Sequence, residues 1–129
     1  MSYNISRRVP MPFPETVASV KKALAAEGFG VLTEIDVQAT LQAKLGVEFG
    51  PYLILGVCNP TFAHQALQIE KNIGLFMPCN IIAYATGEAE TVVAAVRPTV
   101  AMQTVGNPAL GTVASGVETK LEKIIASLY

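Results

Sequence analysis

Hydrophobic and polar residues alternate in two different periods along the first third of the chain. Residues 2–9 alternate polar and apolar, which predicts a half-buried strand. A helix is predicted from Pro14, with apolar residues at helical spacing and Gly28 at its C-terminal end. Residues 30–37 return to strict alternation and predict a second strand. Its apolar and β-branched positions share one predicted face: Val31, Thr33, Ile35 and Val37.

The middle of the chain predicts a short helix, a buried strand and a longer helix. Leu41 and Leu45 lie four residues apart before a glycine, as in a short helix. Residues 52–58 are continuously apolar, which is typical of a strand buried on both faces. Asn59-Pro60 combines an N-cap with a proline at the first helical position, and the helix is predicted to reach about Asn72 and end near Gly74.

The last third predicts a hairpin followed by a helix. Residues 81–85 and 91–96 are two strands, and residues 86–90 form the loop that joins them. Asn107-Pro108 repeats the asparagine–proline helix start. The helix after it has a continuous apolar stripe: Leu110, Val113, Val117, Leu121, Ile124 and Leu128.

The predicted order of elements is β-α-β-(short α)-β-α-β-β-α. Strands joined by tight turns favour a mainly antiparallel sheet with helices packed on it, which is an α+β fold. No linker, repeat or low-complexity stretch divides the sequence, so residues 1–129 are expected to form a single domain.

Composition restricts the possible partners. Hydrophobic residues make up 51% of the chain and charged residues only 15%, and the net charge is −1. We expect no nucleic-acid or membrane partner, because the basic residues do not cluster into a patch. Few charged side chains are available to cover the surface, so we expect apolar surface to be buried in a homo-oligomer.

We recognise no targeting signal near either terminus. No apolar run follows the Arg7-Arg8 pair, and no stretch of eighteen apolar residues could span a membrane. Two cysteines do not make a disulfide scaffold. We therefore expect a cytoplasmic protein whose thiols stay reduced.

Side chains suited to catalysis or metal binding are few. A structural zinc site needs about four nitrogen or sulfur ligands, more than Cys58, His64 and Cys79 supply. A cysteine nucleophile paired with His64 is formally possible, but both cysteines have apolar neighbours, which favours inert thiols. A Cys58–Cys79 disulfide would require their strands to pair, and a reducing compartment opposes it.

The single histidine has a defined place on its predicted helix. Phe62, Ala66, Ile69 and Ile73 form the apolar face, and His64 falls roughly opposite it. Two interpretations stay open: a solvated side chain, or a ligand offered outward to a cofactor or another subunit.

Two further patterns are weak. Residues 28–30 resemble the start of a phosphate-binding glycine loop, but they precede a strand instead of a helix. Glu34 and Asp36 share one strand face. Such a pair could carry out acid–base chemistry, but we prefer to interpret it as the solvated face of an antiparallel strand.

Four segments together resemble the family of domain of unknown function 302. They are EGFGVLTEIDV (27–37), YLILGVCNP (52–60), AHQAL (63–67) and GLFMPCN (74–80). The resemblance implies a curved, mainly antiparallel five-stranded sheet with helices on one side, a TATA-box-binding-protein-like β-α-β4-α core with inserted helices. It also implies a homodimer or higher homo-oligomer, and some similar bacterial proteins are described as haem-binding, in surroundings that suggest sulfur metabolism.

A haem site in this chain would depend on one axial ligand, His64, and on apolar walls. We expect the walls to come from Phe62, Leu75, Phe76 and Met77. One histidine per chain leaves three arrangements: haem b shared by two chains, a five-coordinate site, or a second ligand such as Met77 or Cys79. Covalent attachment is excluded, because no C-x-x-C-H motif is present.

The expected function is therefore non-covalent haem binding by a homo-oligomer, as a haem carrier or a sensor of small gaseous ligands, with His64 binding the iron. One alternative is a homodimeric structural or interaction module without a cofactor. A further alternative is a thiol-based enzyme that uses Cys79. Turnover catalysis is the less favoured expectation.

Overall fold

Five strands form one antiparallel sheet in the order β1-β5-β4-β3-β2. The structure is a computed structural model that describes residues 2–128. The strands are β1 (Asn4–Val9), β2 (Gly30–Asp36), β3 (Tyr52–Cys58), β4 (Cys79–Gly87) and β5 (Glu90–Val96). The helices are α1 (Phe13–Ala26), α2 (Val37–Leu45), α3 (Pro60–Ile69), α4 (Pro98–Ala101) and α5 (Gly111–Ala126), with 3-10 turns η1 (Lys71–Phe76), η2 (Met102–Thr104) and η3 (Pro108–Leu110).

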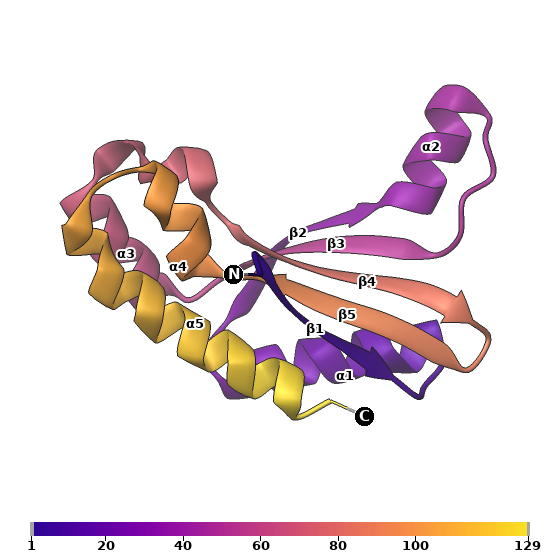
Figure 1. Cartoon of the computed structure of the whole chain (residues 1–129). Helices are drawn as coiled ribbons and strands as arrows, with labels where there is room; N and C mark the ends of the chain where they lie inside the picture. The colour runs from indigo at the N-terminus through magenta and orange to yellow at the C-terminus, as the bar shows by residue number, and fades with distance from the viewer. Residues whose placement is uncertain (1, 129) are drawn as a thin grey trace.

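Helices α1 and α5 pack on the same face of the sheet, which confirms the predicted α+β fold (Figure 1). Alternate strand residues point toward these helices and are fully buried with them. Leu55 and Ile81 from the sheet belong to the same core cluster as Leu24 of α1 and Leu121 of α5. Most of the apolar stripe predicted for the last helix makes this contact, through Val117, Leu121, Ile124 and Leu128. Leu110, which lies on η3, and the partly buried Val113 belong to a second cluster instead.

Within residues 2–128, no helix packs over the opposite face of the sheet. Strand β3 was predicted to be buried on both faces, and this prediction is wrong. Leu55 and Val57 are buried under the helices, whereas Tyr52 and Ile54 are only half-buried. The apolar run reflects a central strand with apolar residues on both sides, only one of which is covered.

Local signals set the ends of several elements. Gly28 has a φ of 80°, the left-handed conformation that ends α1 as predicted. Asp36 accepts a hydrogen bond from the amide of Ala39 at 2.9 Å and so begins α2 at Val37, earlier than Leu41. Gly46, with a φ of 65°, ends that helix.

A bulge in β2 changes the predicted face of that strand. Val31 pairs with Val57 and Thr33 with Gly56, so Leu32 is an extra residue and Val31 faces the opposite side from Thr33. Val37 belongs to a helix. The prediction that all four shared one face is therefore wrong.

Two helical segments differ from the predicted ones. Helix α3 ends at Ile69, and η1 follows it as a separate 3-10 turn. Ile69, expected on the apolar face, is therefore exposed at the helix end. The α4–η2 segment was not predicted, although Pro98 begins it as Pro60 begins α3.

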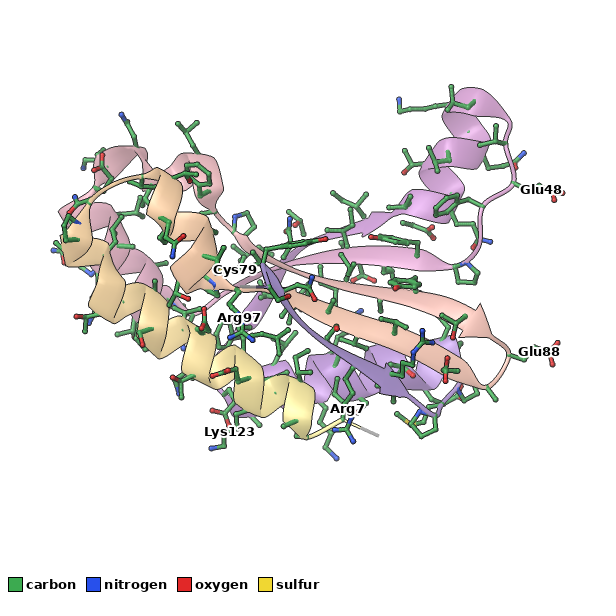
Figure 2. The ribbon with its side chains drawn as sticks, in the orientation of Figure 1. Arg7, Glu48, Cys79, Glu88, Arg97 and Lys123 are labelled. Carbon is green, nitrogen blue, oxygen red and sulfur yellow. The ribbon has the colours of Figure 1, made fainter. Side chains whose placement is uncertain are left out.

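The Arg7 side chain joins the first strand to the last helix (Figure 2). Its guanidinium donates hydrogen bonds to the carbonyls of Ala126, at 2.6 Å, and Ile125, at 3.3 Å. A cation at the C-terminal end of a helix satisfies free carbonyls and offsets the helix dipole. Arg7 therefore has a structural role in the fold.

Candidate functional site: an apolar cavity and an uncovered sheet face

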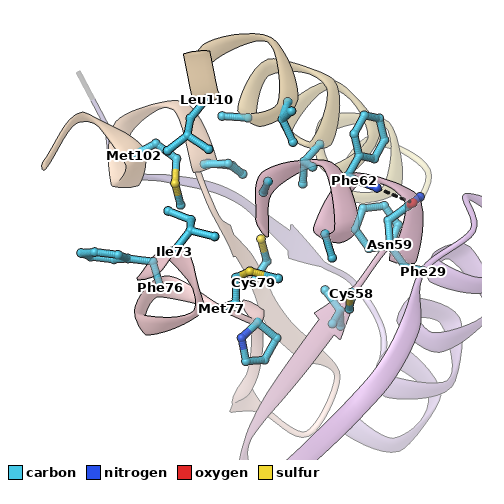
Figure 3. A pocket seen from close by; sticks show the side chains of 18 residues that line it. Phe29, Cys58, Asn59, Phe62, Ile73, Phe76, Met77, Cys79, Met102 and Leu110 are labelled. Carbon is cyan, nitrogen blue, oxygen red and sulfur yellow. Dashed lines mark hydrogen bonds between the residues drawn. The ribbon is translucent and has the colours of Figure 1, made fainter. Parts of the chain in front are cut away.

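An apolar cavity of about 70 Å³ lies where the ends of β3 and β4 meet α3, η1 and the α4–η2 segment (Figure 3). Among the residues described, its lining is hydrophobic except for Cys58, Asn59 and Cys79. A space of this size holds a few waters, a small apolar molecule or an ion.

Asn59 fixes the start of α3 at the edge of the cavity. Its Oδ1 accepts a hydrogen bond from the Phe62 amide at 3.5 Å, and its Nδ2 donates to the carbonyl of Glu27 at 3.4 Å. The side chain thus caps α3 and ties it to the end of α1. This cap places Phe62 and Ala63 in the cavity wall.

The α4 segment is held over the cavity by a carboxylate on α5. Glu118 Oε1 accepts hydrogen bonds from the Thr99 hydroxyl, at 2.6 Å, and the Thr99 amide, at 3.0 Å. Glu118 Oε2 accepts one from Arg97 at 3.1 Å. Burial opposes ionisation of this carboxyl, but the bonds from Thr99 and Arg97 outweigh it, so the pKa of Glu118 lies below its ordinary value.

The two cysteines lie at the same end of the β3–β4 ladder. Cys79 pairs with Val57, the residue before Cys58, and both cysteines are free. Burial, with a smaller contribution from Cys58, raises the pKa of Cys79 to about 11. Burial also raises the pKa of Cys58. Both groups are protonated at neutral pH, which disfavours nucleophilic catalysis.

The residues predicted for a haem site separate into two groups. Phe62, Phe76 and Met77 line the cavity. Leu75 lies outside its lining and is 85% exposed. His64 is also outside the lining, on the solvent-facing side of α3, as the helical spacing predicted.

A haem does not fit the cavity. Pockets that enclose a ligand of that size are several hundred Å³, roughly 300–1,000 Å³ for drug-sized molecules, whereas this cavity measures about 70 Å³. Its walls also lack His64, the one histidine of the chain. A haem enclosed in this cavity is therefore not supported, and the cavity and His64 do not form one site.

Within residues 2–128, no group of three or more histidine, cysteine, aspartate or glutamate side chains is placed to hold a metal ion. None of the helices in that range has the length and apolar character needed to cross a bilayer. Glu34 and Asp36 also have structural partners: Glu34 pairs with Lys21 at 3.0 Å, and Asp36 caps α2.

Sequence reasoning missed the part of the cavity wall that follows β5. Met102 and Leu110 close it from the α4–η2 segment and η3. The available signal was Pro98, since prolines at first helical positions also begin α3 and η3. No local pattern in the sequence brings Met102 to Cys79.

A second feature is a projecting apolar segment, residues 37–49, which we call the arm. It contains α2 and the loop after it, and no residue of α2 is buried. Leu45 is 68% exposed, and Val47 and Phe49 are nearly half exposed. Figure 1 shows α2 beyond the edge of the sheet, on the side opposite α1 and α5.

A third feature is a hollow of about 440 Å³ on the uncovered sheet face, which we call the trough. Among the described residues, its lining has no charged side chain and includes Asn80, Ile82, Tyr84 and Ala94. Tyr84 stacks on Tyr52 with ring centres 5.5 Å apart. The ring centres of Tyr52 and Phe49 are 6.0 Å apart. An aromatic ladder therefore joins the trough to the base of the arm.

Comparison with known proteins gives a consistent result over nearly the whole chain. The family model described as domain of unknown function DUF302 matches residues 5–128. The crystal structure of an uncharacterized conserved DUF302 protein from Bacillus stearothermophilus is similar, with a TM-score of 0.90 and 31% sequence identity over 98% of each chain. No curated protein matches the sequence.

Proposed function

This chain belongs to the family of domain of unknown function DUF302, and we propose that it works in the cytoplasm as a homodimeric interaction module. In this proposal, the arm of each copy fills the trough of the other. The observation that carries it is the presence, on one molecule, of a projecting arm with exposed apolar side chains and of a hollow lined by uncharged polar and apolar residues.

The exposed side chains of the arm supply the driving force. Burying a fully exposed leucine, valine or phenylalanine side chain contributes about 1.5–3 kcal/mol. Leu45 has most of this gain to make, and Val47 and Phe49 have a little under half of it. Two-fold symmetry makes each contact occur twice. The total is comparable with the cost of association, estimated at about 4–15 kcal/mol.

A second copy is the occupant that the charges favour. The net charge of −1 gives two copies little mutual repulsion. Since the trough has no charged lining residue, it matches an apolar segment better than a charged peptide. Homodimers with reciprocal contacts are also the commonest soluble assemblies.

The test is the molar mass in solution, measured by sedimentation equilibrium. We expect a dimer for the native chain. Phe49→Glu places a carboxylate in the apolar contact, and Ala94→Arg fills the trough from the other side. Each change should weaken dimerisation at least 100-fold, about 2.7 kcal/mol. Leu75→Glu is the matched control, because Leu75 is exposed outside the arm and the trough.

Two results would contradict this arrangement. One is a native chain that stays monomeric at about 100 μM, a concentration at which even micromolar dimers form. The other is a dimer that survives both changes and is lost on Leu32→Lys. Leu32 lies on the exposed edge strand β2 and is 64% exposed, so that result would assign the contact to edge pairing.

We propose non-covalent haem binding as a second function, in which two copies of the chain share one haem b through His64. The observation that favours it is the outward position of this histidine on α3. A reachable neutral imidazole is a common metal ligand, and haem bound there would act as a carrier or a sensor of small gaseous ligands.

Hemin titration tests the second function. We expect a Soret shift that saturates at one haem per two chains and is lost in His64→Ala. Gln65→Ala, an exposed neighbour on the same helix, should bind normally. Haem shared between copies must also tighten their association, by about 2.7 kcal/mol at a hundredfold excess over Kd. Identical spectra for the native chain and His64→Ala would refute the ligand assignment.

A further inference from the structure

Four sulfur-containing side chains line the small apolar cavity. Cys58 ends β3, Cys79 begins β4, Met77 precedes β4, and Met102 lies on η2. Both cysteines and two of the four methionines of the chain therefore line one space (Figure 3). Among the described lining residues, only the amide of Asn59 adds a polar side chain.

We propose that this cavity binds one copper(I) ion, anchored by the Cys79 thiolate and completed by the thioethers of Met77 and Met102. Thiolate and thioether sulfurs are soft ligands that select copper(I). Zinc requires about four nitrogen or sulfur ligands and rarely accepts thioethers, and magnesium and calcium require oxygen. The donor set therefore matches one class of ion.

Charge balance decides how many thiolates take part. One thiolate and Cu⁺ form a neutral unit, which can lie among hydrophobic side chains without the cost of burying a net charge. A second thiolate would leave one negative charge there, and none of the described lining residues is cationic to offset it. The two thioethers add ligands without adding charge.

Burial decides which cysteine is the anchor. Cys79 packs against the core cluster that the sheet forms with α1 and α5. Cys58 lies at the end of β3 beside Asn59, which borders the loop between β3 and α3. We assign Cys58 to the entry of the site, where its thiol receives copper from a carrier.

The binding step is ligand exchange without redox change. Cu⁺ arrives as a complex with a small-molecule thiol, and the Cys79 S–H loses its proton to solvent as the sulfur–copper bond forms. The carrier thiolate leaves and takes up a proton from solvent. Copper stays in the +1 state throughout, so neither an oxidant nor a reductant is consumed.

The test uses the full chain, reduced and free of oxygen, titrated with Cu⁺ in competition with bicinchoninate. We expect one Cu⁺ per chain and a thiolate-to-copper absorption band in the ultraviolet. Cys79→Ser should weaken binding by more than about 100-fold, since even the loss of a residue that only orients a ligand costs about 10- to 100-fold. Met77→Leu and Met102→Leu preserve volume and should each weaken it about tenfold.

Matched controls separate the site from general metal binding. Met11 carries a thioether that packs against the core outside the cavity, so Met11→Leu should bind copper normally. His64→Ala should also bind normally, which distinguishes this site from the proposed haem ligand. The proposal does not depend on dimerisation, because all its ligands come from one chain.

Several outcomes would overturn the proposal. Absence of one-to-one binding would exclude the site, as would equal losses in Met11→Leu and Met77→Leu. Two protons released per copper, measured in weakly buffered solution with a thiol-free copper(I) complex, would contradict the single-thiolate assignment. If Cys79→Ser fails to fold, the two methionine variants still decide the result.

Discussion

The aromatic ring of Phe62 lies directly against the backbone of Gly116. A Cβ atom built on Gly116 would stand 2.7 Å from Cε1 of Phe62, closer than packed carbon atoms approach. This contact brings α3 onto α5 and closes one side of the cavity. A glycine inside a helix costs about 1 kcal/mol relative to alanine, and here it makes room for the ring.

The first prediction concerns this contact. Gly116→Val should lower the free energy of unfolding by about 1–3 kcal/mol, because overpacking displaces the Phe62 ring. Urea denaturation measures the effect. Phe62→Ala combined with Gly116→Val should cost less than the sum of the single changes, since the clash is absent. Gly111→Ala, where a Cβ meets no atom within 4 Å, is the control and should not destabilise.

A second prediction concerns Gly56 in the central strand β3. A Cβ at this position would overlap Thr33 Oγ1 and stand 2.8 Å from Cγ of Pro78. Gly56→Ala should destabilise the protein by about 1–3 kcal/mol, and Thr33→Ala should recover part of the loss. Gly30→Ala on the neighbouring strand serves as the comparison, because its Cβ would meet open space. Equal stability of the two alanine variants would contradict the close packing at Gly56.

The third prediction is a pH dependence at Glu118. Its pKa is lowered in the folded protein, so the ionised carboxylate stabilises the fold above the ordinary value of about 4.3. That contribution is lost as the pH falls through the lower folded value. Denaturation at a series of pH values should therefore show a steeper acid decline for the native chain than for Glu118→Gln.

At neutral pH, Glu118→Gln should cost about 1–2 kcal/mol, the size expected for hydrogen bonds to a charged group. Glu122 contacts the same Arg97 at 3.3 Å, but its side chain is half exposed. Glu122→Gln should therefore cost less than about 0.5 kcal/mol. If stability falls with pH in the same way for both variants, Glu118 does not hold α4 in place.

The fourth prediction concerns the reactivity of the two thiols. With a pKa of about 11, Cys79 should react with iodoacetamide far more slowly than a free cysteine at pH 7. Its rate should rise about tenfold per pH unit up to that pKa. Cys58→Ser and Cys79→Ser isolate each thiol, and Cys58 should be the faster. If Cys79 reacts as fast as a free cysteine, catalysis by this thiol becomes a candidate function again.

The same shift predicts a stability change at alkaline pH. An unfolded thiol ionises near its ordinary value of 9.0, whereas folded Cys79 stays neutral up to about 11. The unfolded state therefore loses its proton first, and stability should fall as the pH rises between these two values. Cys79→Ala should remove this part of the alkaline decline.

The sequence by itself determined all five strands and most of the helices, with their order, because their signals are local. Gly28 needs the left-handed conformation that ends α1, and Asn59 caps α3 from one residue outside it. Helical spacing likewise placed His64 on the solvent side of α3. Each of these signals acts within a few residues, so it can be recognised without knowledge of the fold.

The tertiary structure alone decided which faces are covered and which distant residues meet. The apolar run of β3 is compatible with one or two covered faces, and only the packing of α1 and α5 shows that one is bare. Met102 reaches the cavity of Cys79 because Glu118 holds α4 against α5. Such contacts depend on long-range packing and strand register, which no short window of sequence contains.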